Sequence, residues 1–107
     1  MEGWRAAIDL DEIWEGELLS REIDSLGVLL VNIGGRVLAF RDRCPHAGTP
    51  LIQGSLEGTV LTCPTHLWQF DVANGGTGVN PKNCRLTAIP VRIEAGKVLV
   101  EIKRQEP

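Results

Sequence analysis

Short runs of apolar residues recur along this chain between Gly, Pro, Asn and Asp, and helical periodicity is almost absent. This pattern is typical of a small all-β domain. Residues 28–33 and 36–40 are two such runs, and they flank Gly34-Gly35. Because glycine tolerates the positive φ angles of tight hairpin turns, the pattern predicts a β-hairpin there.

A second hairpin is predicted around Ala95-Gly96, because apolar and charged residues alternate on both sides of this turn. The apolar set, expected on the buried face, is Val91, Ile93, Val98, Val100 and Ile102. Further strand candidates are residues 4–8, 18–23, 59–62 and 69–71, which makes about eight short strands in all. One short helical piece is expected at residues 10–14, with Asp9 as its N-cap.

The pattern of residues changes between residue 41 and about residue 84, where prolines and glycines interrupt any long strand. Such irregular segments form loops, and loops on a rigid scaffold often carry the function. We find no internal repeat and no linker. The sequence therefore predicts a single domain over residues 1–107, with residues 41–84 inserted as a subdomain in the β scaffold.

Composition and charge exclude several classes of function. The chain has 107 residues, 14 acidic and 11 basic side chains, and a formal charge of -3. Its basic residues are scattered, which argues against a nucleic-acid partner. The longest apolar run, residues 28–31, is far shorter than the roughly 20 residues that cross a bilayer, and the N-terminal residues do not resemble a secretory signal. We expect a cytoplasmic monomer that binds no membrane.

Two short motifs within the irregular segment carry candidate chemistry. They are Cys44-Pro45-His46 and Cys63-Pro64-Thr65-His66, and they include both histidines and two of the three cysteines. An odd number of cysteines does not suit a disulfide framework. Two loops that each supply one thiolate and one imidazole can close around a metal centre. A zinc site uses the same ligand types, although zinc sites more often pair Cys-x-x-Cys with closely spaced histidines on a helix.

The pattern Cys-x-His, 16 residues, Cys-x-x-His resembles the Rieske iron-sulfur signature. This resemblance implies one [2Fe-2S] cluster, with Cys44 and Cys63 on one iron and His46 and His66 on the other. It also implies the all-β Rieske iron-sulfur fold, a β-sandwich-like scaffold with an inserted cluster-binding subdomain.

The flanking residues resemble one group within this family. High-potential Rieske proteins carry a further cysteine in each loop, joined as a disulfide, whereas Gly48-Thr49 and Pro64-Thr65 stand in the corresponding loops here. The segments 10–17, 67–71 and 78–84 resemble the ferredoxin component of bacterial toluene and alkene monooxygenases. A third loop over the cluster is expected at Asn80-Pro81.

The resemblance implies a one-electron carrier between an NADH-dependent flavin or iron-sulfur reductase and a diiron hydroxylase. The carrier itself would not be an enzyme, because no histidine is left for a mononuclear iron site and no dinucleotide-binding glycine motif is present. Three alternatives stay open. They are the ferredoxin of a Rieske dioxygenase system, a small subunit of another redox enzyme, and a zinc-stabilised interaction module.

A few other residues carry expectations. Trp4 and Trp14 are expected to pack in the scaffold, and Trp68 either beside the cluster or in the core. Cys84 is expected to be a buried free thiol. An apolar rim around the cluster is expected from Pro45, Leu51, Pro64 and Pro81. The carboxylates of Glu12, Glu15, Glu17 and Glu22 are expected to form a solvated face.

Overall fold

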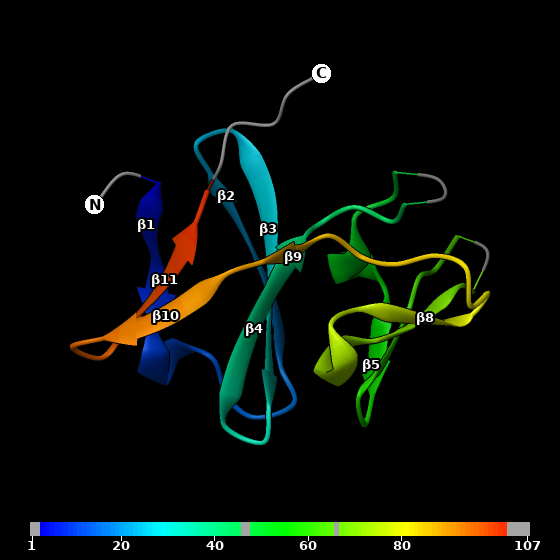
Figure 1. Ribbon diagram of the computed structural model, residues 1–107. Helices are drawn as coiled ribbons and strands as arrows, with labels where there is room; N and C mark the ends of the chain where they lie inside the picture. The colour runs from blue at the N-terminus through cyan, green and yellow to red at the C-terminus, as the bar shows by residue number, and fades with distance from the viewer. Residues whose placement is uncertain (1–2, 46–47, 66, 103–107) are drawn as a thin grey trace.

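The computed structural model describes residues 3–45, 48–65 and 67–102, which form three antiparallel sheets (Figure 1). The first sheet has the order β1 (Trp4–Asp9), β11 (Lys97–Glu101), β10 (Val91–Glu94). The second has the order β2 (Leu18–Ile23), β3 (Leu26–Ile33), β4 (Arg36–Arg41), β9 (Ala88–Ile89). The third has the order β5 (Ser55–Glu57), β6 (Val60–Thr62), β7 (Gln69–Asp71), β8 (Thr77–Asn80). The predicted all-β class is confirmed.

Both predicted hairpins are present. Strands β3 and β4 pair in register from Val28 opposite Arg41 to Ile33 opposite Arg36. The two glycines between them have φ angles of 61° and 91°, in the left-handed region that glycine adopts without a steric penalty. Strands β10 and β11 pair up to Glu94 opposite Lys97. Because β1 pairs with the other side of β11, β11 is the central strand of the first sheet and β10 is an edge strand.

The sequence pattern missed three strands and misplaced one side chain. Strands β5 and β9 have three and two residues, too few for a period of two to be visible. Strand β8 contains glycine and asparagine, which are depleted in strands. Ile93 of β10 was expected on the buried face but is 44% exposed, because β10 is an edge strand whose outer end lies beyond the core.

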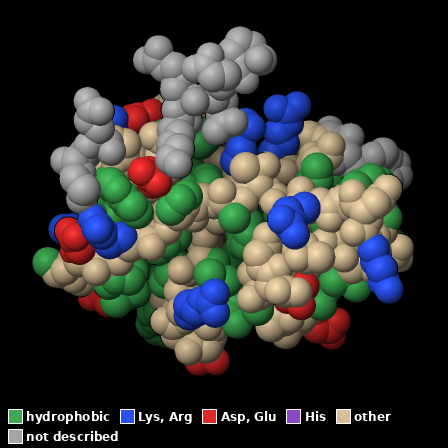
Figure 2. Space-filling model, viewed as in Figure 1, with side chains coloured by type: hydrophobic (Ala, Val, Ile, Leu, Met, Phe, Trp, Pro, Cys, Tyr) green, Lys and Arg blue, Asp and Glu red, His purple; other side chains and the backbone are tan. Residues whose placement is uncertain are grey.

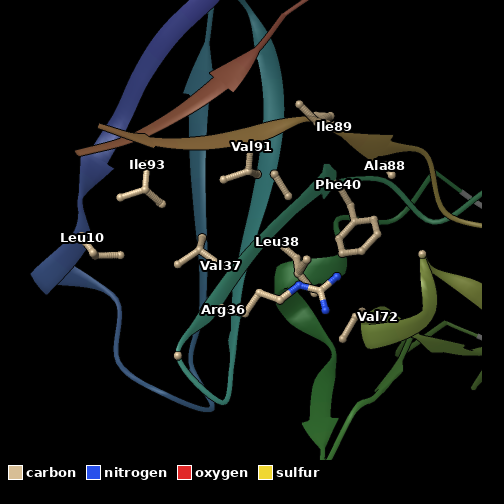
Figure 3. A pocket seen from close by; sticks show the side chains of 13 residues that line it. Leu10, Arg36, Val37, Leu38, Phe40, Val72, Ala88, Ile89, Val91 and Ile93 are labelled. Carbon is tan, nitrogen blue, oxygen red and sulfur yellow. The ribbon is translucent and has the colours of Figure 1, made fainter. Parts of the chain in front are cut away.

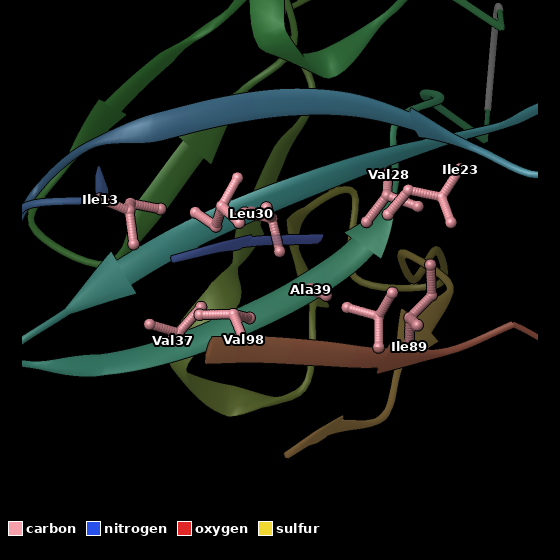
Figure 4. Packing of buried hydrophobic residues seen from close by; sticks show 10 residues of the cluster. Ile13, Ile23, Val28, Leu30, Val37, Ala39, Ile89 and Val98 are labelled. Carbon is pink, nitrogen blue, oxygen red and sulfur yellow. The ribbon is translucent and has the colours of Figure 1, made fainter. Parts of the chain in front are cut away.

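The second sheet lies between two hydrophobic cores, and its strand β3 is buried on both faces. Along β3, Val28 and Leu30 point into the first core, between the first and second sheets (Figure 4). Leu29 and Val31 belong to the second core, against the third sheet. All four side chains are fully buried. A strand covered on both faces must be apolar at consecutive positions, which explains the unbroken run at residues 28–31.

The predicted helical piece is a single 3-10 turn, η1 (Leu10–Glu12). At its start the side chain of Glu12 accepts a hydrogen bond of 3.0 Å from the backbone N–H of Asp9. The next residue, Ile13, is buried, and its carbonyl accepts a 2.9 Å hydrogen bond from the buried Asn32 side chain. Trp14 is 72% exposed, so the expectation that it packs in the scaffold was wrong. None of the described helices is long and apolar enough to cross a membrane.

Candidate metal centre

Two loops carry the candidate ligands, and Figure 1 shows them at the same end of the molecule, on the right. The first follows β4 of the second sheet, and the second connects β6 and β7 of the third sheet. Both are closed by the same kind of bond. The N–H of Cys44 donates to the carbonyl of Thr49 at 2.8 Å, and the N–H of Cys63 donates to the carbonyl of Trp68 at 2.7 Å. Each loop thus turns back on its own cysteine.

Cys44 and Cys63 are both buried, at 1% exposure each, and both belong to the second core. Neither takes part in a disulfide. Apolar surroundings disfavour a thiolate unless a cation compensates its charge, and a bound metal supplies that charge. Two buried thiols at the bases of neighbouring loops therefore fit a metal centre that takes two cysteine ligands.

The predicted imidazole ligands, His46 and His66, lie outside the described residues. Among the residues that the structure does describe, no group of three or more potential ligands comes together. The cysteine half of the predicted site is thus placed in one core, and the full set of four ligands stays a prediction.

Asp42 fixes the chain just before the first loop. Its carboxylate accepts hydrogen bonds from the hydroxyl of Ser20, at 2.7 Å, and from the N–H of Ile52, at 2.9 Å. Ser20 lies on β2 and Ile52 on the 3-10 turn η2 (Leu51–Gln53), so one side chain connects the scaffold to the segment after the first loop. Charge-assisted bonds of this kind are stronger than neutral ones. The chain just before Cys44 is therefore tied to both β2 and η2.

A third loop follows β8, where the Asn80-Pro81 bond is cis. The N–H of Gly78 donates to the carbonyl of Cys84 at 2.8 Å and holds this loop against β8. The thiol of Cys84 packs against the second core but is only half-buried, so it is less enclosed than expected. Figure 1 shows the loop at the same end of the molecule as the two cysteine loops.

The apolar surface at this end differs from the predicted rim. Leu51 is fully buried in the second core, so its expected place in the rim was wrong. Pattern reasoning missed Leu67, which is 67% exposed and has a φ of 58°, and Val79, which is 40% exposed. The left-handed backbone at Leu67 is costly for a residue with a Cβ, and no sequence period signals it. Trp68, next along the chain, is half-buried and packs against the second core.

Charge is distributed unevenly between the scaffold and the loop end. Residues 3–40 contain seven acidic and three basic side chains, whereas residues 41–85 contain three acidic and four basic ones. Three of those basic side chains, Arg43, Lys82 and Arg85, are exposed in the loops around the site. Figure 2 shows Lys and Arg side chains spread over the side that carries these loops. All four carboxylate residues expected on a solvated face are exposed: Glu12, Glu15, Glu17 and Glu22.

A groove of about 600 Å³ lies between the scaffold and the third sheet (Figure 3). Its walls are mostly apolar and come from β4, β9, β10 and η3 (Val72–Asn74), with Arg36 as the charged side chain on its border. None of the described residues that line it is a cysteine, a histidine or a carboxylate. The groove therefore offers no ligands for a metal.

Comparison with known proteins agrees with this geometry. Residues 3–90 match the Rieske [2Fe-2S] domain family. The chain is 41% identical to the ferredoxin component of the alkene monooxygenase system of Xanthobacter autotrophicus, covering 85% of this chain and 75% of that protein. It is 31% identical to the ferredoxin component of the naphthalene 1,2-dioxygenase system of Pseudomonas aeruginosa, covering 94% of this chain and 97% of that protein.

Solved structures show the same likeness. The ferredoxin of carbazole 1,9a-dioxygenase from Nocardioides aromaticivorans superposes with a TM-score of 0.85 at 26% identity, covering 95% of this chain and all of that one. A Sphingomonas yanoikuyae ferredoxin gives a TM-score of 0.81 at 25% identity, covering 92% of this chain and 98% of that one. The chain therefore belongs to the Rieske [2Fe-2S] domain family, and it is a ferredoxin that carries electrons on a Rieske-type [2Fe-2S] cluster rather than an enzyme.

Proposed function

We propose that this ferredoxin passes single electrons from an NADH-dependent flavin or iron-sulfur reductase to the diiron hydroxylase of an alkene or aromatic monooxygenase, as a cytoplasmic monomer. The likeness to the alkene monooxygenase ferredoxin, 41% identity, carries this proposal, since the dioxygenase ferredoxins of Pseudomonas aeruginosa and Pseudomonas putida reach 31% and 29%. The two cysteine loops lie inside the region that matches the family, residues 3–90.

Four side chains would hold the cluster in this proposal: Cys44 and Cys63 on one iron, and His46 and His66 on the other. The bound cluster supplies a site that accepts and releases one electron. The protein's part is to exclude water from the cysteine side. Both cysteines lie in the second core, at 1% exposure, with the fully buried Leu61 and Phe70 as neighbours in that core. An electron-transfer partner therefore approaches from the loop end, where the chain is exposed.

The loop end has the features of a docking surface. Leu67 and Val79 offer apolar area, and exposed Arg43, Lys82 and Arg85 surround the site. Interfaces commonly combine an apolar centre with a polar rim, and complementary charge speeds and orients the encounter. The partner that fits this surface has an apolar depression bordered by carboxylates. Such carboxylates would repel the acidic scaffold, so the ferredoxin would approach its partner with the loop end in front.

A Rieske dioxygenase is the second candidate partner, because the fold superposes closely on a carbazole dioxygenase ferredoxin. A reconstitution assay separates the two. The reduced ferredoxin is mixed anaerobically with a diiron hydroxylase of an alkene monooxygenase system or with the oxygenase of a naphthalene dioxygenase system, and its reoxidation is followed by absorbance. We expect fast reoxidation, and product formation with oxygen, only with the diiron hydroxylase. Turnover with the dioxygenase alone would reverse the assignment.

A further inference from the structure

A hydrogen bond joins the two cysteine loops through their side chains. The hydroxyl of Thr49 in the first loop meets the hydroxyl of Thr65 in the second loop. Thr49 also accepts the 2.8 Å hydrogen bond from the N–H of Cys44 through its carbonyl, and Thr65 lies two residues after Cys63. Thr49 is thus bonded to Cys44 through its backbone carbonyl and to the loop of Cys63 through its hydroxyl.

The two loops need such a link because they come from different sheets. The first loop leaves β4 of the second sheet, and the second loop joins β6 to β7 of the third sheet. Each is fixed within its own part: Asp42 bonds the approach to the first loop at 2.7 and 2.9 Å, and the pairing of Thr62 with Gln69 closes the base of the second. The bases of the two loops are connected, because η2 leads into β5 and Ser55 of β5 pairs with Thr62 of β6. The bond between Thr49 and Thr65 joins the loops beyond these bases.

We propose that Thr49 and Thr65 form a positioning pair that sets the separation of the two cysteine loops and thereby controls how firmly the cluster is held. This inference rests on the proposed assignment of Cys44 and Cys63 as ligands of one iron. Metal centres tolerate only small changes in ligand distance, so a contact that limits the relative motion of two ligand loops slows ligand loss. Neither hydroxyl is a ligand in this proposal.

Removing either hydroxyl breaks the same bond, which makes the pair testable by a cycle of variants. Thr49→Val and Thr65→Val keep the side-chain shape, and each is expected to accelerate iron release about two- to ten-fold, the range given by one net hydrogen bond. The double variant is expected to match the single ones because no further bond is lost. Thr49→Ser and Thr65→Ser keep a hydroxyl and are expected to restore the parent rate.

The measurement is the decay of visible absorbance of the oxidised holoprotein in the presence of an iron chelator, together with the midpoint potential by protein-film voltammetry. The matched control is Thr77→Val, which removes a 2.6 Å hydrogen bond from a hydroxyl to the carbonyl of Asn74 in the same part of the molecule. It is expected to leave both readouts unchanged. The valine variants are expected to shift the potential as well, which a defect in folding alone would not do.

Three outcomes would overturn the positioning role: parent-like release rates in both valine variants, additive effects in the double variant, or a Thr77→Val control that loses iron as fast as they do. Failure of the ligand assignment is separately visible. A Cys44→Ser variant that keeps a parent-like cluster spectrum would remove the proposed ligand set, whatever the threonine variants show. A parent-like spectrum for that variant is not expected, because serine replaces the thiolate at one iron.

Discussion

Gly54 lies where the turn η2 passes the end of strand β6, and replacing it with alanine tests whether this close approach positions Cys63. A Cβ on Gly54 would lie 2.1 Å from the carbonyl oxygen of Thr62, the residue before Cys63. The backbone of Gly54 has a φ of -85°, which any residue adopts, so the substitution adds only the clash. We therefore expect Gly54→Ala to displace the base of the second cysteine loop.

The size of that displacement follows from the distance. An ordinary contact between a carbon and a carbonyl oxygen is about 3.3 Å, so Thr62 or Gly54 must move by roughly 1.2 Å. Metal-ligand distances are defined within about 0.2 Å, so a shift of this size at the neighbour of Cys63 is several times what the site tolerates. Overpacking of this kind costs about 1–3 kcal/mol of folding free energy, and sometimes more.

Iron and acid-labile sulfide per chain, measured on freshly purified protein, report the effect. We expect Gly54→Ala to contain much less of both than the parent, while the far-ultraviolet circular dichroism of the sheets is retained. Gly27→Ala is the matched control: its Cβ would lie 3.6 Å from the Cβ of Asp42, an ordinary contact, so it is expected to keep full cluster content. A Gly54→Ala protein with parent-level iron, sulfide and potential would refute the reasoning.

Three further predictions concern docking and stability. Leu67→Ala is expected to raise the KM for the hydroxylase about tenfold in the reconstituted assay without changing the midpoint potential, because only exposed contact area is lost. Asp42→Ala removes two hydrogen bonds and is expected to lower the free energy of unfolding by roughly 2–4 kcal/mol in thermal unfolding. Ser20→Ala removes one of them and is expected to lower it by about 1 kcal/mol. Equal losses of unfolding free energy in the two variants would contradict this difference. The hydrogen bond to Asp9 raises the pKa of Lys97, so the contribution of this pair is complete below the ordinary lysine pKa of 10.5 and is lost as pH rises through the raised value. A Lys97→Met protein is therefore expected to lose less thermal stability than the parent between pH 8 and about pH 11.5.

The strands of the first two sheets, except the two-residue β9, could be predicted because their apolar positions repeat over four residues or more. The hairpin at residues 28–41 is the clearest case, with Gly34-Gly35 marking the turn. The sequence did not show that β3 is buried on both faces, although the run at residues 28–31 is consistent with it. That requires knowledge of the third sheet, two of whose strands, β5 and β8, have too few apolar residues for a pattern.

The exposed aromatic and aliphatic side chains were the hardest to predict. Trp14 was expected to pack in the scaffold, but its neighbour Ile13 occupies the core, and the indole N–H of Trp14 donates at 3.3 Å to the carbonyl of Asp11 on the surface. Leu67 is exposed because its backbone adopts a left-handed conformation, which no local pattern of hydrophobic residues encodes. The exposure of Trp14 and of Leu67 thus follows from the direction of the backbone rather than from the composition of the segment.

The candidate ligands could be named from spacing alone, but the contacts that hold their loops could not. Thr49 and Thr65 are 16 residues apart, and Ser20 and Asp42 are 22 apart. Hydrogen bonds over such separations depend on how the sheets pack, and polar residues in irregular segments have many possible partners. The chemistry of this site is thus local in sequence, whereas its geometry depends on the whole fold.

Pulsed electron paramagnetic resonance of the dithionite-reduced protein, grown with ¹⁵N-labelled histidine, tests the central claim most directly. The proposed ligands predict two irons and two sulfides per chain, a reduced-state signal, and couplings to one nitrogen from each of two histidines, His46 and His66. A colourless protein with stoichiometric zinc, or an iron-sulfur signal without histidine nitrogen couplings, would contradict it.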